Sequence, residues 1–303
     1  MTAPELPKLP ARDPHGHKGT FGLTVVVGGA CEGAVTMLGG PALTAIAALR
    51  SGSGLVRLAM PAPLMTSALS FAPCATGVAL PVTRDGAIDP SPAAEAIDVA
   101  LRGCTCMAIG PGLGTGPAVE QVIARLLVRE DLPIVLDADG LNAFADMPDA
   151  AGDLRAPAVL TPHPGEYRRL AATLELPDID DSVERRRSGA EALARRLGAV
   201  VVLKGAGSIV TDGLSTTVNE TGNAALATGG SGDVLTGIIA GLISQHFRPF
   251  APPGTTLGLL DCVRVAVHAH GRVADVWADE HGTRGMVATD LLDGLPDVLA
   301  ALE

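Results

Sequence analysis

The chain has 303 residues, of which 47% are hydrophobic and only 2% aromatic, and its formal net charge is −11. This hydrophobic content excludes a disordered chain, and the shortage of rings means that the core must be aliphatic. The acidic charge and the absence of interleaved aromatic residues argue against nucleic-acid binding. Glycine is in excess: there are 37 residues, about 12% of the chain where about 7% is usual. The position of this extra glycine is therefore informative.

The sequence shows no sign of export or membrane insertion. Five cysteines occur at scattered positions without the paired spacing of a metal site, and free thiols of this kind are typical of a reducing compartment. The N-terminus lacks the apolar core of a signal peptide, and no run of about 18 apolar residues could span a bilayer. These features predict a cytoplasmic protein.

The sequence predicts one domain that follows a short N-terminal arm. Residues 1–20 are rich in proline and polar side chains, which predicts a surface arm whose first part, residues 1–14, is flexible. Between residues 15 and 303 no linker or change of composition divides the sequence. We therefore expect a single domain over 15–303.

Strand-like and helix-like segments alternate along the chain. In chain order the patterns predict a strand at 23–27, a helix at 41–50, a strand at 54–59, a helix at 92–101, a strand at 107–109, a helix at 117–129, strands at 133–136 and 158–160, a helix at 182–197, a strand at 200–203, a hairpin at 209–218, and helices at 232–245, 257–278 and 290–302. Such alternation predicts an α/β fold with a central, mainly parallel sheet flanked by helices on both faces. The long helix at 257–278 is either an oligomer interface or part of the core.

Glycine and polar residues gather directly after the predicted strands, where open α/β sheets bind their ligands. The segments are Gly28-Gly29, 110–114 (GPGLG), 137–140 (DADG), 161–166 (TPHPGE), 204–207 (KGAG) and 227–233 (ATGGSGD). One such loop alone is usually a simple turn. All of them at strand ends in one chain predict a ligand site.

The segment 227–237 gives the strongest of these signals. Three glycines and a serine lead into an apolar helix, and the free N–H groups of a helix N-terminus are suited to a phosphate. Asp233 falls in the first turn of this helix. It either stabilises the helix N-terminus or accepts a proton from a substrate hydroxyl that attacks phosphorus. The chain has no P-loop, and GPGLG lacks the spacing of a dinucleotide-binding loop.

Further segments complete a pattern that runs along nearly the whole chain. They are HKGTFG (17–22), VVVGG (25–29), LDADGLN (136–142), VLKGAGSIV (202–210), TGGSGDVL (228–235) and HGTRGMVATDLL (281–292). Together with GPGLG and TPHPGE they resemble, over about residues 15–300, the ADP-dependent NAD(P)H-hydrate dehydratase family of the ribokinase-like superfamily. Other small-molecule kinases of the superfamily usually lack HPGE. The resemblance implies a ribokinase-like fold and, because the chain is too short for the epimerase domain fused to many members, a stand-alone dehydratase.

The resemblance also implies an activity. Such enzymes repair hydrated NADH and NADPH by phosphorylating the substrate hydroxyl from ADP (or ATP) with Mg²⁺ and then eliminating phosphate. The products are AMP, phosphate and NADH or NADPH. A homotetramer is implied, as is a separate epimerase acting on the same substrate. Two alternatives stay open: a kinase of a vitamin precursor, such as hydroxyethylthiazole or hydroxymethylpyrimidine, and a non-catalytic nucleotide-binding sensor.

The family motifs imply roles for particular residues, with Asp233 as the catalytic base. The hydrated substrate is expected to contact Gly40, Gly112, Gly114, His163 and Asp233. The nucleotide is expected to contact Lys204, Gly205, Ala206, Gly207, Ser208 and Gly232, and an anion hole to form from Gly229, Gly230, Ser231 and Gly232. No side chain is assigned as a metal ligand. Gly40 stands where many relatives carry alanine, and Ser231 where threonine is common.

The roles of several charged residues are informative or open to two interpretations. Lys204 and Lys18 are two of only three lysines in a chain with 19 arginines, which favours a specific role because arginine does not replace lysine at a compact phosphate contact. Lys18 is a second phosphate-binding cation or a surface residue. Glu166 either stabilises a helix start or anchors a hydrogen bond. Asp137 and Asp139 either approach Mg²⁺ through water or stabilise their turn.

Overall fold

A nine-stranded sheet forms the centre of the molecule, in the order β3-β2-β1-β4-β5-β6-β7-β8-β9. The computed structural model describes residues 5–147, 149–247 and 256–303. Strands β1 to β7 are parallel, whereas β8 and β9 pair antiparallel at one edge. The strands are β1 (Leu23–Val27), β2 (Leu55–Pro61), β3 (Thr76–Leu80), β4 (Cys106–Ile109), β5 (Ile134–Leu136), β6 (Ala158–Leu160), β7 (Val200–Leu203), β8 (Ile209–Thr211) and β9 (Thr216–Val218). The predicted fold class is confirmed.

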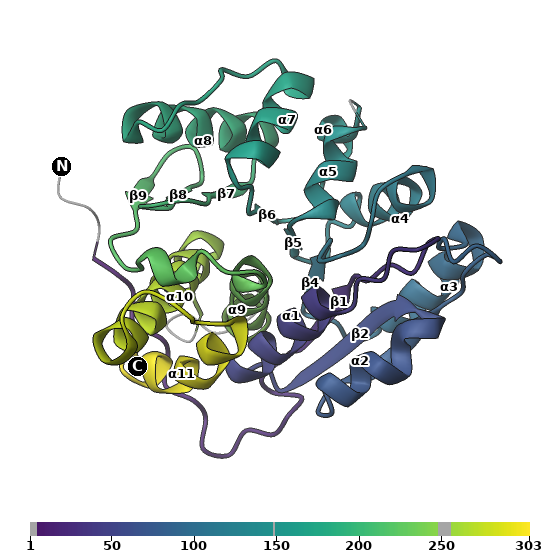
Figure 1. Ribbon diagram of the computed structural model, residues 1–303, viewed down its shortest axis with the longest axis horizontal. Coiled ribbons are helices and arrows are strands. Elements are labelled where there is room, and N and C mark those ends of the chain that lie inside the picture. Colours follow the sequence, from purple (N-terminus) through teal and green to yellow (C-terminus); the bar gives the residue numbers. More distant parts are fainter. Residues whose placement is uncertain (1–4, 148, 248–255) are drawn as a thin grey trace.

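Helices cover both faces of the sheet (Figure 1). One face carries α3 (Pro90–Ala100), α4 (Pro117–Leu127), α5 (Asp139–Ala145), α6 (Ala150–Asp153), α7 (Pro164–Leu174) and α8 (Val183–Leu197). The other carries α1 (Gly39–Arg50), α2 (Met65–Phe71), α9 (Ser231–His246), α10 (Leu259–His281) and α11 (Ala288–Ala300). The apolar side of α10 is buried in this second layer, so the helix is part of the core.

The central strands are apolar on both sides because both faces of the sheet are covered. Every residue of β1 is buried. Since successive side chains of a strand point to opposite faces, Val25 and Val27 enter the core beneath α3 and α4, whereas Val26 enters the core beneath α1 and α9. The parallel register brings the carboxyl ends of β1, β4, β5, β6 and β7 to one edge, where the polar segments follow.

Sequence patterns did not predict α2, β3, α5 or α6. Strand β3 pairs only with β2 at the edge of the sheet, and most of its residues are partly or fully exposed. It therefore lacks the apolar run that marks the inner strands. Helix α5 follows β5 after only two residues, and its first turn contains Asp139 and Gly140, for which the sequence pattern predicts a loop.

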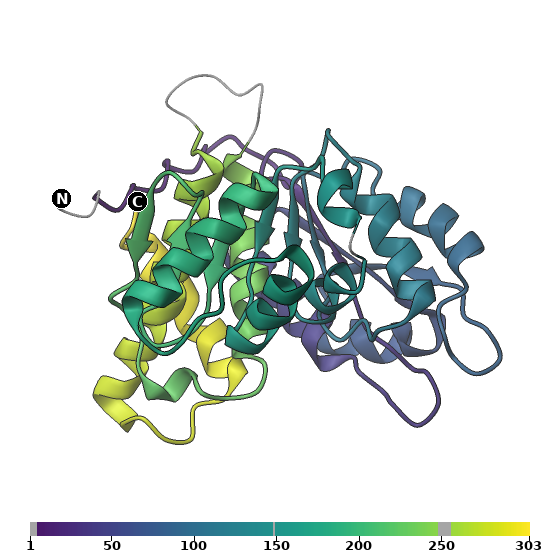
Figure 2. The same ribbon diagram turned by 90° about the horizontal axis from the view of Figure 1, so that it is seen from above.

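The N-terminal arm lies at the edge of the sheet opposite to these polar loops (Figure 2). Leu9 is buried, and its N–H donates to the Leu302 carbonyl at 2.7 Å. The Arg12 guanidinium lies 3.8 Å from the centre of the Phe21 ring. Residues 1–4 of the segment that we expected to be flexible lie outside the described residues. Across the described ranges, no helix is both long and apolar enough to cross a membrane.

Candidate active site

The loops that follow the parallel strands converge at the carboxyl edge of the sheet (Figure 2). Helix α9 begins there at Ser231, directly after Gly230, which has a φ of 89°. Glycine adopts this left-handed conformation without strain. A Cβ at this position would also come within 2.7 Å of Leu43 and 2.9 Å of Ala288. The turn therefore presents the first N–H groups of a 16-residue helix, which have no intrahelical partners.

Asp233 lies in this first turn with a carboxylate that is free to act. Within the described part of the chain its oxygens have no hydrogen-bond partner, whereas its backbone carbonyl accepts from Thr44 Oγ1 at 3.0 Å. Burial and the nearby charge of Asp137 raise the pKa of Asp233 to about 6, against the opposing effect of Lys204. A carboxylate held in this way is suited to accept a proton near neutral pH. The geometry favours the proton-accepting interpretation over a helix-stabilising one.

A buried ion pair lies beneath Asp233. Asp137 is only 2% exposed, and its Oδ1 lies 2.7 Å from Lys204 Nζ. Thr161 and Thr236 donate their hydroxyls to the same carboxylate, each at 2.8 Å. Burial alone would lower the pKa of Lys204, but Asp137 and Glu166 raise it above its usual value. Lys204 is therefore a fixed cation at the base of the site.

The turn between Asp137 and Asp139 has an unusual backbone conformation. Ala138 has φ 49° and ψ −122°, one of two described non-glycine residues with positive φ. Strain of this kind is typical of functional sites. Because of this turn, Asp137 points into the core, whereas Asp139 Oδ2 accepts from the Gly114 N–H at 2.9 Å. Both carboxylates thus have structural partners.

His163 and Glu166 stabilise the start of α7 reciprocally. His163 Nδ1 accepts from the N–H groups of Gly165 and Glu166, and Glu166 Oε2 accepts from the His163 N–H at 2.8 Å. Since Nδ1 is an acceptor, the ring proton resides on Nε2. Burial and Lys204 lower the pKa of His163, so the ring is neutral at pH 7. Burial raises the pKa of Glu166 to about 7.

A cavity of about 750 Å³ opens beside the first turn of α9. Its walls come from the loop after β7, the segment 219–228, the start of α9 and the middle of α10. The cavity includes every predicted nucleotide contact, namely Lys204, Gly205, Ala206, Gly207, Ser208 and Gly232, and also His163 and Ser231. A volume of this size is typical of a ligand pocket, which usually measures about 300–1,000 Å³.

Helix α10 forms one wall of this cavity and supports its other walls through hydrogen bonds. Sequence patterns did not predict this role. The buried His270 Nε2 lies 3.1 Å from Ser231 Oγ and 3.0 Å from the Ser231 carbonyl. Burial lowers the pKa of His270 to about 4, so the ring is neutral. Asp275 accepts from the Gly222 N–H and from Asn223 Nδ2, both at 2.9 Å. One helix thus fixes the start of α9 and the wall opposite.

Glycines line the other side of Asp233. A Cβ at Gly40 would lie 3.0 Å from Asp233 Oδ1, and a Cβ at Gly112 would lie 3.0 Å from the Cβ of Met37. Gly114 follows, with its N–H bound to Asp139. Three of the predicted substrate contacts, Gly40, Gly112 and Gly114, are thus glycines, and Gly40 lies directly against the Asp233 carboxylate. His163, which was also predicted to contact the substrate, lines the cavity on the other side. We call the surface formed by Gly40, Gly112 and Gly114 the glycine floor.

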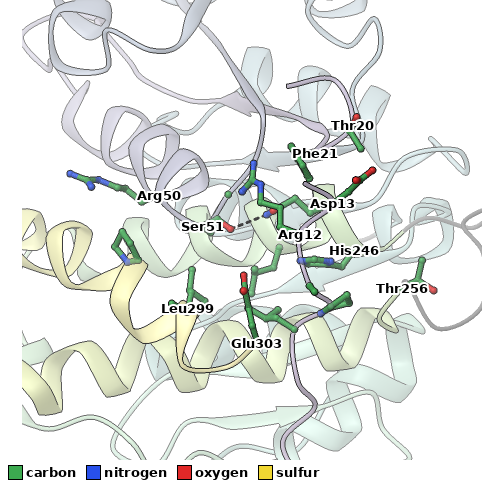
Figure 3. Close-up of a pocket in the computed structure, with 18 residues that line it drawn as sticks. Arg12, Asp13, Thr20, Phe21, Arg50, Ser51, His246, Thr256, Leu299 and Glu303 are labelled. Carbon is green, nitrogen blue, oxygen red and sulfur yellow. Dashed lines mark hydrogen bonds between the residues drawn. The ribbon is translucent and has the colours of Figure 1, made fainter. Parts of the chain in front are cut away.

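A second cavity of about 750 Å³ lies at the opposite, amino edge of the sheet. Figure 3 shows it between the N-terminal arm and the C-terminal ends of α1, α9 and α11, with Arg12 and Glu303 in its walls. Lys18 belongs to this edge, because its carbonyl lies against Gly54 just before β2. Lys18 is thus remote from Asp233 within the chain, and of the two motif lysines only Lys204 belongs to the site.

The described residues contain no cluster of three or more side chains suited to hold a metal ion. Asp137 is saturated by Lys204 and two threonines, and Asp139 is held by Gly114 and Asn142. This donor set does not fit a cage of protein ligands. It is compatible with Mg²⁺ that arrives on a nucleotide, since the ion commonly keeps several waters and binds phosphate oxygens.

A family model for NAD(P)H-hydrate dehydratase matches residues 25–297. The chain belongs to this family. Among its relatives, the ADP-dependent (S)-NAD(P)H-hydrate dehydratase of Bacillus subtilis is 34% identical over 298 residues, which cover 97% of this chain and 95% of that protein. The predicted family is confirmed.

Other members of the NAD(P)H-hydrate dehydratase family are longer. The bifunctional NAD(P)H-hydrate repair enzymes Nnr of Salinibacter ruber and Moorella thermoacetica are 39% and 40% identical to this chain, and the match covers 50% and 52% of their lengths. The chain thus spans about half the length of these relatives. A crystal structure of the ADP/ATP-dependent NAD(P)H-hydrate dehydratase from Bacillus subtilis, co-crystallised with ATP and Mg²⁺, superposes with a TM-score of 0.74 at 31% identity over 98% of this chain and 95% of that one.

Proposed function

We propose that this chain is an ADP- or ATP-dependent dehydratase that restores NADH and NADPH from their hydrated forms. One observation carries the proposal: the Asp233 carboxylate, which has no hydrogen-bond partner among the described residues, lies between the nucleotide-sized cavity and the glycine floor. A phosphate donor on one side and a hydroxyl on the other would meet at this carboxylate. Family membership supplies the identity of the substrate.

The first step of the proposed reaction is phosphoryl transfer. Asp233 accepts the proton of the 6-hydroxyl of the hydrated nicotinamide ring while the hydroxyl oxygen attacks the terminal phosphorus of the nucleotide. The bond from phosphorus to its bridging oxygen breaks, and AMP leaves when ADP is the donor. The N–H groups at the start of α9 and the cation of Lys204 stabilise the charge of the transferring group.

The second step is elimination. The lone pair of the ring nitrogen expels phosphate from the new ester by breaking the bond between C6 and oxygen. The neighbouring ring carbon then loses a proton to the released phosphate or to solvent, which restores the dihydronicotinamide. The oxygen of the original hydroxyl therefore leaves with phosphate. Neutral His163 lines the cavity, and its Nε2–H, which lies 3.4 Å from Glu166 Oε1, is the group that would orient an oxygen of the substrate.

Mg²⁺ enters this proposal as part of the nucleotide substrate. When bound, the ion neutralises phosphate charge. The protein's own contribution is Lys204, whose position is fixed by Asp137 and, at 3.9 Å, by Glu166 Oε2. The Bacillus subtilis relative was crystallised with ATP and Mg²⁺, which supports the assignment of the nucleotide complex.

The proposal is tested by incubating the purified chain with hydrated NADH, Mg²⁺ and either ADP or ATP. We expect the absorbance of the dihydronicotinamide ring to return in proportion to the phosphate released. No recovery with either nucleotide would contradict the proposal. A stable phosphorylated product would instead indicate a small-molecule kinase, and tight nucleotide binding without turnover would indicate a sensor.

We also propose that the protein acts in the cytoplasm as a homotetramer, beside a separate epimerase that interconverts the two epimers of the hydrate. Five free cysteines support a reducing compartment. The link to an epimerase is supported by the bifunctional relatives, of which this chain matches only about half. Size-exclusion chromatography with light scattering tests the tetramer, and a monomer at micromolar concentration would contradict it.

A further inference from the structure

A buried arginine lies behind the loop that follows β7. Arg186 is on α8, which packs against β7 and β8 (Figure 1), and it is only 7% exposed. Sequence patterns do not distinguish it, because α8 carries several other arginines. We propose that Arg186 is a positioning residue of the nucleotide site, which holds this loop so that free N–H groups face the phosphates of ADP or ATP. The inference rests on the proposed function, because it takes a nucleotide as the ligand of the loop.

The guanidinium of Arg186 binds the loop through three main-chain carbonyls. Its Nη1 donates to the Ala206 carbonyl at 2.6 Å, and its Nη2 donates to the carbonyls of Leu203 at 3.4 Å and Gly207 at 3.2 Å. A Cβ at Gly205 would come within 2.8 Å of Nη2. The guanidinium can therefore approach the loop this closely only because residue 205 has no side chain. One arginine thus holds the loop along most of its length.

These bonds determine the direction of the loop's N–H groups. In a planar trans peptide the N–H points away from the carbonyl, so a peptide whose carbonyl faces Arg186 turns its N–H to the opposite side. The N–H groups of Gly207 and Ser208 belong to two such peptides, and neither donates a hydrogen bond within the described part of the chain. Two donors without partners therefore lie on the side of the loop that faces away from α8.

The nucleotide-sized cavity lies on this same side of the loop. Gly207 and Ser208 both line it, and its other walls include α9 and α10. These two helices cover the face of the sheet opposite to α8. The bonds from Arg186 thus turn the two free N–H groups toward the cavity, where an anionic ligand would accept from them.

The remaining peptide of the three joins Leu203 to Lys204, the cation of the site. Its carbonyl accepts from Arg186, and its N–H donates to the Pro162 carbonyl at 2.9 Å. The peptide is therefore held on both sides at the point where the Lys204 side chain leaves the main chain. Arg186 thus supports the position of the Lys204 ammonium group as well as the direction of the free N–H groups.

The charge of Arg186 is not neutralised by a close carboxylate. Among the described residues, Asp181 is the acid whose charge acts on it, against the effect of burial, which lowers the pKa of Arg186. Its Nε is also buried without a hydrogen-bond partner in the described ranges. An arginine stays protonated when buried, and an unpaired buried charge is costly. The guanidinium polarises the peptides that it binds and so strengthens their N–H groups as donors to a phosphate, which supplies the missing negative charge.

The test measures binding of ADP with Mg²⁺, and of adenosine, by titration calorimetry. We expect Arg186→Met to weaken ADP binding about ten- to thirtyfold, and binding of adenosine, which has no phosphate, by less than about threefold. The KM for ADP should rise with the dissociation constant, whereas kcat at saturating ADP should stay within about threefold of the wild type, because Asp233 is unchanged.

Arg195→Met is the matched control. Arg195 lies on the same helix and donates to the Gly213 carbonyl at 3.0 Å, in the turn between β8 and β9. This turn does not line the cavity. The control variant therefore loses the same kind of bond between α8 and the sheet, and it should bind ADP as the wild type does.

Arg186→Lys provides a second variant in case Arg186→Met does not fold, as judged by its thermal transition. Lysine keeps a buried cation but cannot reach three carbonyls at once, so ADP binding should weaken about three- to tenfold. Equal losses for ADP and adenosine in folded variants would mean that the loop has collapsed, and unchanged ADP binding would remove Arg186 from the site. Either result overturns the inference. Titration needs no turnover, so a chain that shows the expected binding but never restores NADH would contradict only the proposed function.

Discussion

Two cavities of about 750 Å³ lie at opposite edges of the same sheet, and they differ in chemistry and not in size. The cavity at the carboxyl edge borders a buried ion pair between Asp137 and Lys204 and the start of a long helix. At the amino edge, the charged residues Arg12 and Asp13 are exposed, and the C-terminal ends of α1 and α9 line the cavity. The volume of a cavity therefore does not identify the site. The two cavities are distinguished by the buried charges, held by hydrogen bonds, that border the one at the carboxyl edge.

The largest effect should come from removing the carboxylate of Asp233 at the carboxyl edge. Asp233→Asn removes the proton acceptor while keeping the shape of the side chain. We expect kcat to fall by about 10²–10⁴, the usual contribution of a general base, with little change in nucleotide affinity. The matched control is Asp13→Asn at the other cavity, which should retain wild-type turnover. Steady-state kinetics and nucleotide titration measure both, and near wild-type turnover of Asp233→Asn would remove Asp233 from this role.

Lys204→Met tests the buried ion pair. It leaves Asp137 buried without its cation, which should lower stability by about 2–3 kcal/mol, slightly less than a fully buried pair would lose because Thr161 and Thr236 still donate. Turnover should fall about a hundredfold, since the charge facing the phosphate is lost. Adding Asp137→Asn should recover most of the stability but not the turnover. Thermal melts and kinetics separate the two effects, with Lys8→Met, an exposed lysine, as the control.

The pH dependence should differ between the wild-type chain and the Asp233 variant. Because burial raises the pKa of Asp233 to about 6, the base is protonated below that pH and competent above it. We expect kcat/KM to fall roughly tenfold for each unit below pH 6 and to be level above it. The residual activity of Asp233→Asn should lack this limb. A wild-type profile that is flat between pH 5 and pH 7 would contradict the assignment.

The smallest effect should come from His270, which acts through Ser231 and touches no reacting atom. His270→Gln should raise the KM for ADP about three- to tenfold and change kcat little, because the start of α9 loses its support from α10. His268→Gln is the control on the same helix, because the hydrogen bond that His268 makes to the cavity wall uses its backbone carbonyl, which accepts from Thr221 Oγ1. If the two variants behave alike, His270 has no positioning role.

Sequence alone predicted much of the carboxyl edge, for a physical reason. In a parallel sheet the carboxyl ends of neighbouring strands meet, so GPGLG, TPHPGE and KGAG could be assigned to one site before any distance was known. The residues that were missed act through tertiary contacts. Thr161 and Thr236 lie inside recognised motifs, but their shared bond to Asp137 depends on how β6 and α9 pack. His270 has no motif of its own.

The amino edge shows the limit of motif reasoning. Lys18 belongs to HKGTFG, a segment as recognisable as the others, yet it precedes β1 and therefore lies at the opposite edge from Asp233. The glycine excess was informative for the same topological reason. Gly40, Gly112 and Gly230 lie where a Cβ would approach a neighbouring atom within about 3 Å. Gly40 borders the Asp233 carboxylate, and Gly230 directly precedes the helix that carries it.

The central claim is that the substrate hydroxyl is phosphorylated before it leaves, and an oxygen label tests this most directly. Hydrated NADH that carries heavy oxygen in its 6-hydroxyl is converted with unlabelled ADP, and the released phosphate is analysed by mass spectrometry. We predict one labelled oxygen in each phosphate, because the bond between carbon and oxygen breaks in the elimination. Label in water with unlabelled phosphate would mean that the hydroxyl leaves without phosphorylation, and would contradict the proposed role of Asp233.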